Sequence, residues 1–127
     1  MDYDLQQARD FFRRKLAFTT GPHELAAAID ARRDDFAIVD VRYPGDFRKG
    51  HIPGAVSLPK GQWASPRGLA KDKLNILYCY SQTCHLAAEA ALELLAQGYR
   101  VAEMEGGFAA WEANGSPVEA RPAREAA

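Results

Sequence analysis

Two short, nearly continuous apolar runs constrain the fold of this chain more than any other feature. The first covers residues 36–41 and carries Asp40 and Arg42 at its end, and the second covers residues 74–79. Runs of this length are typical of parallel strands that are buried on both faces of a sheet. A shorter run at residues 100–104 predicts a further strand.

A helical pattern lies between the last two predicted strands, over residues 83–97. Its apolar residues recur at helical spacing and Gly98 follows as a stop signal. A strand, a helix and a strand joined by short links predict a βαβ crossover. We therefore expect an α/β fold with a mostly parallel central sheet and helices on both faces.

Residues 1–16 are expected to form an extra N-terminal helix. Five apolar residues share one of its faces, namely Leu5, Ala8, Phe11, Phe12 and Leu16. This face must be buried, most simply on the same domain, and a partner or dimer surface is the alternative. A short extended piece is expected at residues 17–19. Pro22 fits an early position in a second helix, whose core face would be Leu25, Ala28 and Ile29.

The length of 127 residues and the absence of repeats predict a single domain. Its core is expected over residues 17–115, with the extra helix before it. A last helix is expected around residues 108–113. Residues 116–127 contain Pro117 and Pro122 and are expected to be a frayed tail.

The composition excludes several classes of partner. A net charge of −1 gives no basic surface that would argue for nucleic acid or a membrane surface. No apolar run approaches the roughly 20 residues of a membrane span, and residues 1–15 lack the apolar centre of a signal peptide. We expect a cytoplasmic protein that binds neither nucleic acid nor membrane, and the oligomeric state stays open.

Cys79 ends the second predicted strand, at the sheet edge where ligands of parallel α/β sheets bind. The chain then turns and is expected to enter a helix near Thr83, whose first N–H groups lack partners within the helix. These groups and the helix dipole favour an anion. They predict a lowered pKa and a nucleophilic thiolate at Cys79. A cysteine that only packs in the core is the alternative.

The only other cysteine is Cys84, in the predicted first turn of that helix. Two cysteines do not make a disulfide framework, and in a reducing compartment both stay thiols. Cys84 is either a resolving thiol for Cys79 or a passive loop residue. Together with His85 the two cysteines fall short of the four ligands of a zinc site, and their spacing does not fit haem attachment. We expect neither a metal nor a cofactor.

Three stretches of the chain resemble the rhodanese (thiosulfate sulfurtransferase-like) family. Residues 40–59 contain Asp-x-Arg followed by Gly-His-Ile-Pro-Gly-Ala, residues 77–81 surround Cys79, and residues 105–111 contain Gly-Gly-Phe-x-x-Trp. Their order and spacing also agree with the family over residues 20–116. The resemblance implies sulfur transfer through a persulfide on Cys79. The sulfur donor would be thiosulfate, a polysulfide or a protein persulfide, and the acceptor would be a thiol, including a thiol of a protein.

The resemblance also implies roles for other residues. Arg42 would add positive potential, and Asp40 would tie down the strand end or pair with a nearby base. His51 would support the turn through Pro53 and Gly54, and Trp111 would pack the last helix on the sheet. The sulfur would be wrapped by the backbone N–H groups of five loop residues, Tyr80, Ser81, Gln82, Thr83 and Cys84.

The loop departs from the common family pattern Cys-Arg-x-Gly-x-Arg. Tyr80 and Cys84 replace both arginines, and Gln82 replaces the glycine. Less fixed positive charge should weaken the binding of dianionic thiosulfate, so we expect slow thiosulfate turnover. A phosphatase of the same fold is disfavoured because no arginine lies in the loop to clamp phosphate. A thiol/disulfide switch through both cysteines and a non-catalytic interaction module stay open as alternatives.

Overall fold

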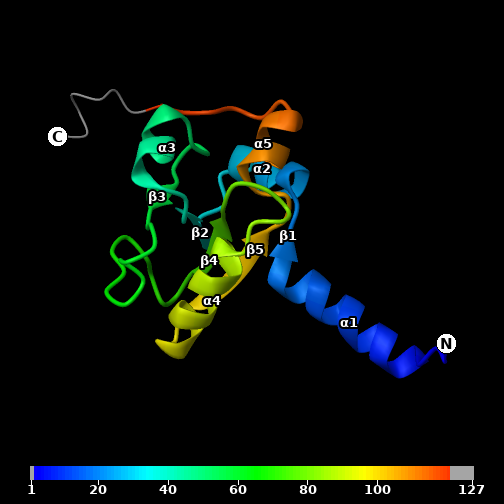
Figure 1. The fold of residues 1–127 in the computed structure, drawn as a ribbon. Coiled ribbons are helices and arrows are strands. Elements are labelled where there is room, and N and C mark those ends of the chain that lie inside the picture. The colour runs from blue at the N-terminus through cyan, green and yellow to red at the C-terminus, as the bar shows by residue number, and fades with distance from the viewer. Residues whose placement is uncertain (1, 121–127) are drawn as a thin grey trace.

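The computed structural model describes residues 2–120 and contains a five-stranded sheet in which all strands run parallel (Figure 1). The strand order is β1-β5-β4-β2-β3. The strands are β1 (Thr19–Thr20), β2 (Phe36–Asp40), β3 (Val56–Ser57), β4 (Leu74–Tyr78) and β5 (Arg100–Met104). The helices are α1 (Leu5–Phe18), α2 (Pro22–Asp30), α3 (Pro44–Lys49), α4 (Leu86–Ala96) and α5 (Gly107–Ala113). The predicted parallel α/β fold is confirmed.

Both faces of the sheet are buried. Successive residues of β2 and β4 point to opposite sides, and the side chains on each side pack in an apolar cluster of their own. The apolar cluster beneath α4 includes Val39, Leu77 and Cys79. The cluster beneath α2 and α5 includes Ile38, Ile76 and Tyr78. Covering helices on both faces explain why the strands are nearly continuous apolar runs and not alternating ones.

Helix α4 begins later than the sequence predicts. Its N-cap is His85 and its first residue is Leu86, three residues after the expected start at Thr83. Before it, the Cys84 N–H donates to the Ser81 carbonyl at 3.2 Å. The side chain of Gln82 accepts a hydrogen bond from the Gly106 N–H at 2.7 Å. These contacts hold residues 81–84 as a loop, so they do not form the first helical turn.

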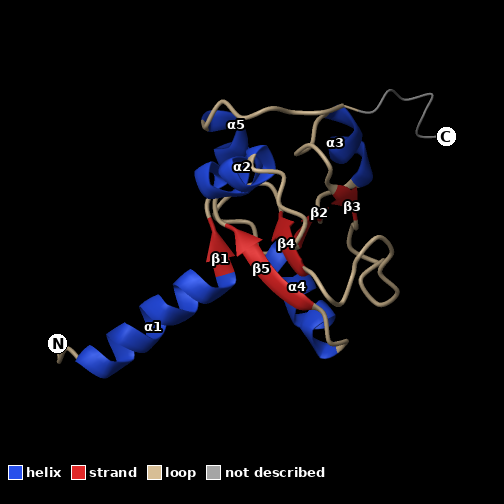
Figure 2. Cartoon of the chain, turned by 180° about the vertical axis from the view of Figure 1, so that it is seen from behind, coloured by secondary structure: helices blue, strands red, loops and turns tan. Residues whose placement is uncertain are grey.

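Helix α1 extends away from the rest of the domain (Figures 1 and 2). It begins after the N-cap Asp4 and includes Ala17 and Phe18, which the sequence placed in an extended piece. None of its residues is buried. The expectation that its apolar face packs on this domain is therefore wrong. Its polar anchor to the sheet is an ion pair of 2.9 Å between Lys15 and Glu105 near its C-terminal end.

The start of the C-terminal tail is anchored and not frayed. Glu119 exchanges backbone hydrogen bonds of 2.8 and 2.9 Å with His51. The indole N–H of Trp111 donates to the Pro117 carbonyl at 2.8 Å. These contacts hold the tail across the molecule, while residues 121–127 lie outside the described residues. Trp111 packs in the cluster beneath α2 and α5, as expected.

His51 is buried and joins different segments from those expected. Its Nδ1 donates to the Phe47 carbonyl at 2.7 Å, and its ring stacks on the Phe47 ring at 3.8 Å between centroids. His51 therefore links the end of α3 to the tail, and the turn at residues 53–54 receives no such bond from its side chain. Within residues 2–120, no helix is long and apolar enough to cross a bilayer.

Candidate functional site

Cys79 lies directly after β4, at the carboxyl edge of the sheet, where the sequence places it. Its side chain points into the cluster beneath α4 and is 2% exposed. The thiol donates toward two loop carbonyls, with its Sγ 3.5 Å from the Cys84 oxygen and 3.9 Å from the Ser81 oxygen. The loop therefore holds Cys79 as a neutral thiol in the resting protein.

Burial, and to a smaller extent the hydrogen bond with the Cys84 side chain, raise the pKa of the Cys79 thiol to about 11. The predicted lowering of this pKa is therefore wrong. Helix α4 begins at Leu86, so its N-terminus is farther along the chain than expected. Backbone hydrogen bonds from Ala87 and Ser81 lower the pKa, and they do not outweigh burial.

Cys84 is half-buried, and the pKa of its thiol is shifted in the opposite direction to that of Cys79. Burial opposes its ionisation, but the hydrogen bond with Cys79 and the backbone of Leu86 and Tyr80 lower its pKa below the ordinary value. Within this pair, Cys84 is the sulfur that ionises first. The two cysteines thus share one hydrogen-bonded arrangement in which Cys84, the less buried of the two, is the more acidic thiol.

Removing the second thiol is expected to make the first one more acidic. In Cys84→Ala, the pKa of Cys79 should fall below about 11, because both the hydrogen bond and the charge of Cys84 raise it. Alkylation by iodoacetamide across a pH series, read by peptide mass spectrometry, measures this pKa because the thiolate is the reacting form. In the unaltered chain, Cys84 should be alkylated at lower pH than Cys79. An unchanged Cys79 profile in Cys84→Ala would contradict the pairing of the thiols.

The N-terminus of α5 packs directly against the Cys79 loop. The Phe108 N–H donates to the Cys79 carbonyl at 2.8 Å and the Ala109 N–H donates to the Tyr80 carbonyl at 3.0 Å. Gly107 has a φ of +63°, and a Cβ there would lie 2.6 Å from the Ser81 nitrogen. Only glycine permits this approach. This role of Gly107 is not among the predictions from the sequence, although a Gly-Gly pair before a helix is a signal of such a close approach.

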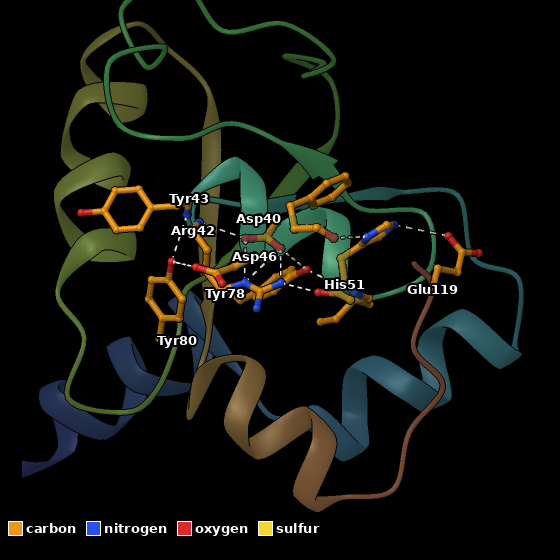
Figure 3. A network of polar contacts seen from close by, with 11 residues as sticks. Asp40, Arg42, Tyr43, Asp46, His51, Tyr78, Tyr80 and Glu119 are labelled. Atoms are coloured by element: carbon orange, nitrogen blue, oxygen red, sulfur yellow. Dashed lines mark hydrogen bonds and ion pairs between the residues drawn. The ribbon is translucent and has the colours of Figure 1, made fainter. Parts of the chain in front are cut away.

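Asp40 and Arg42 form a buried ion pair on the other face of the sheet (Figure 3). The Nη2 of Arg42 donates to the Asp40 Oδ2 at 2.8 Å and to the Gly50 carbonyl at 2.6 Å. The Tyr78 hydroxyl also donates to Asp40, at 2.7 Å. Asp40 thus pairs with a nearby base and holds the strand end.

The strand register explains why this pair and the Cys79 thiol lie apart. Asp40 is paired with Tyr78 across β2 and β4, so both side chains point to the face of α2 and α5. Cys79 is the next residue and points to the face of α4. The guanidinium of Arg42 lies 4.1 Å from the centre of the Phe108 ring on the α5 side. Arg42 therefore lies on the face opposite the thiol, where Asp40 balances its charge.

The predicted loop residues separate into distinct environments. The Tyr80 hydroxyl donates to Asp46 and accepts from the Tyr43 N–H, so its ring turns toward α3 (Figure 3). Tyr80 also lines a cavity of about 360 Å³ between α3 and α5. The hydroxyls of Ser81 and Thr83 lie 3.3 Å apart. Among the five predicted loop residues, the side chain that contacts the Cys79 thiol is that of Cys84.

Residues 2–120 contain no cluster of three or more His, Cys, Asp or Glu side chains with metal-binding geometry. What the site offers is thiol chemistry. Cys79 supplies a nearly enclosed sulfur nucleophile, and Cys84 supplies a second, more acidic thiol beside it. The loop, which is bonded to α5 through its backbone, can enclose a covalent adduct on Cys79.

The chain is similar in sequence to known proteins of one family. A family model described as a rhodanese-like domain matches residues 21–114. A sulfurtransferase of Allochromatium vinosum is 34% identical over 92 residues, which cover 71% of this chain and 84% of that protein. The thiosulfate sulfurtransferase GlpE of Pseudoalteromonas translucida is 36% identical over 83 residues, which cover 64% of this chain and 77% of that protein.

Solved structures have the same fold. The crystal structure of the BH2092 protein from Bacillus halodurans matches with a TM-score of 0.85 at 29% identity, and the match covers 92% of this chain and 87% of that chain. Other curated relatives are longer proteins, and this chain spans 38% and 24% of two of them.

Proposed function

Because the chain belongs to the rhodanese-like domain family, we propose that it is a sulfurtransferase that works through a persulfide on Cys79. The observation that carries this proposal is the position of Cys79. Its thiol lies at the carboxyl edge of the sheet, at the start of a loop that backbone hydrogen bonds from α5 hold in place. The donor is thiosulfate, a polysulfide or a protein persulfide, and the acceptor is a thiol.

The reaction has two displacements at sulfur. In the first, the Cys79 thiolate attacks the outer sulfur of the donor, a new S–S bond forms, and the donor leaves with the electrons of its broken bond, as sulfite when the donor is thiosulfate. In the second, the acceptor thiolate attacks the outer sulfur of the persulfide and releases the Cys79 thiolate. Nothing is oxidised or reduced overall, because the sulfane sulfur only changes its carrier.

The first displacement requires loss of the Cys79 proton. With a pKa of about 11, the resting thiol is almost entirely protonated near neutral pH. The Cys84 thiol is hydrogen-bonded to Cys79 and ionises first. A Cys84 thiolate is thus placed to accept the proton as the donor approaches, which makes it a proton acceptor for the reaction.

The charge around the loop favours some donors over others. No basic side chain lies among residues 79–84, and the Arg42 guanidinium is paired with Asp40 on the opposite face. Dianionic thiosulfate therefore meets no fixed positive charge of the loop. We expect polysulfide or a persulfide donor to load Cys79 faster than thiosulfate does.

Mass spectrometry of the reduced protein after incubation with thiosulfate, and separately with polysulfide, tests this function. The expected result is a gain of one sulfur atom on the Cys79 peptide that an acceptor thiol removes. The gain is absent in Cys79→Ser and present in Cys84→Ser, which keeps the nucleophile. No adduct from either donor, with Cys79 also unreactive toward alkylation, would leave the interaction module as the better reading.

A second function is favoured by the contact between the two thiols. The Cys84 thiolate attacks the inner sulfur of the Cys79 persulfide, forms a Cys79–Cys84 disulfide and releases the outer sulfur as hydrosulfide. Such a step turns the relay into a thiol/disulfide switch. The same spectra, recorded without reductant, distinguish the two, because the switch yields a linked pair of cysteine peptides and the simple relay does not.

A further inference from the structure

Helix α1 carries an apolar face that no part of residues 2–120 covers. Leu5, Phe12 and Leu16 lie on one side of the helix and are 69%, 55% and 82% exposed. The helix has 14 residues, and an isolated helix of this length is only marginally stable in water. A surface that buries this face is therefore needed to keep α1 helical.

An apolar groove lies at the base of α1, between α4 and β5. It has a volume of about 520 Å³, and of α1 only Phe18 lines it. Figure 2 shows α1 leading away from the sheet and from α4. Leu92, one of the lining residues, is 72% exposed. The other apolar side chains that line the groove include Ala88, Ala91, Leu95, Val101 and Ala102.

Charge also matches between the helix and the groove. Glu103 is the one charged residue that lines the groove, and it forms no ion pair within residues 2–120. Burial and the neighbouring Glu105 carboxylate raise its pKa above the ordinary value, and His85 lowers it by a smaller amount. Arg9 and Arg13 flank the apolar face of α1 and form no ion pair in the same residues. A helix docked in the groove brings a guanidinium toward Glu103.

The size of the two surfaces fits a second copy of this chain. A reciprocal exchange places two identical helix–groove contacts about a two-fold axis. Large apolar side chains that are more than half exposed offer on the order of 100 Å² each. The helix face and the groove together present six such side chains, Leu5, Phe12, Leu16, Phe18, Leu92 and Leu95. Two contacts therefore bury on the order of 1,200 Å², which is the lower end of the range for specific, stable interfaces.

We propose that two copies of this chain form a dimer in which α1 of each lies in the α4–β5 groove of the other. The helix lies before the part that the family model matches, which begins at residue 21. The match to BH2092 covers 92% of this chain, more than residues 19–127 alone provide, so it extends into α1. The dimer does not depend on sulfur transfer, since neither Cys79 nor Cys84 lines the groove.

Light scattering after size-exclusion chromatography of the full chain tests the dimer. The unaltered chain is expected at twice the monomer mass. Phe12→Glu, on the helix, and Leu92→Glu, in the groove, should each halve that mass. The matched control is Arg14→Glu, which introduces the same glutamate side chain two residues from Phe12 and hence on the opposite side of the helix. It changes the net charge by two units, more than either test variant does, and it should stay dimeric. All these side chains are exposed, so the sheet and its covering helices should stay folded in every case. Circular dichroism checks this, and a small loss of helix is expected where the dimer is lost, because an uncovered α1 is only marginally stable.

Mixing the two variants separates the exchange from other dimers. The Leu92→Glu chain keeps an intact helix, and the Phe12→Glu chain keeps an intact groove. In an equimolar mixture the helix of the first should dock in the groove of the second. The resulting heterodimer has one of the two contacts and should be weaker than the unaltered dimer. An unaltered chain that is monomeric up to millimolar concentration would overturn the proposal. A dimer that Phe12→Glu breaks and Leu92→Glu does not would also overturn it, because the helices would then pair with each other.

Discussion

Replacing Asp40 with alanine is expected to lower the free energy of unfolding by about 3 to 5 kcal/mol, the usual cost of removing one partner from a buried ion pair. The carboxylate accepts hydrogen bonds from the Arg42 guanidinium and backbone and from the Tyr78 hydroxyl. Without it, Arg42 stays buried with the Gly50 carbonyl as its remaining hydrogen-bond acceptor. Urea unfolding followed by circular dichroism measures the loss.

Two control variants show whether the buried charge causes the loss. Asp35→Ala removes an ion pair with Arg33 in which both side chains are exposed, so stability should change little. The double variant Asp40→Leu with Arg42→Met leaves no charge in the core and should recover most of the stability. Equal losses in Asp40→Ala and Asp35→Ala, or a double variant as unstable as Asp40→Ala, would contradict this account.

Gly107→Ala is expected to lower the free energy of unfolding by about 2 to 4 kcal/mol, from a left-handed backbone and a steric clash together. It is also expected to stop persulfide formation. The new Cβ would lie 2.6 Å from the Ser81 nitrogen and 2.7 Å from the Cys79 oxygen, both backbone atoms that cannot swing aside. The loop must therefore move away from α5, which breaks the hydrogen bond from the Phe108 N–H to the Cys79 carbonyl.

Gly115→Ala is the matched control for this variant. Gly115 also has a positive φ, +74°, but a Cβ there meets nothing within 4 Å. It should lose about 1 kcal/mol from the backbone conformation alone and keep full sulfur loading. Unfolding curves and persulfide mass spectra of both variants separate the two effects. The same small loss in both, with loading intact, would mean that the close approach of α5 does not hold the Cys79 loop.

The fold was predictable because its signals are local. The apolar runs at residues 36–41 and 74–79 and the helical stripe between residues 83 and 97 need only neighbouring residues to reveal parallel strands and a crossover helix. The position of Cys79 at a strand end was predictable for the same reason, since the carboxyl edge of a parallel sheet follows from strand direction alone.

The properties of the site depend on contacts between segments that are distant in the sequence. The spacing of neighbouring residues does not reveal such contacts. The pairing of Asp40 with Tyr78 decides that Arg42 lies on the face opposite Cys79. The late start of α4 and the enclosure of the thiol reverse the expected direction of its pKa.

The sequence by itself determined that this chain forms a parallel α/β sheet with a cysteine at the carboxyl edge. It also determined an amphipathic helix at the N-terminus, because hydrophobic spacing is a local property. Only the tertiary structure decided how acidic that cysteine is, which face Arg42 occupies, and that α1 leaves the domain with its apolar face uncovered. The physical reason is that burial, register and docking are set by residues far apart in the chain, such as Gly107 beside Cys79.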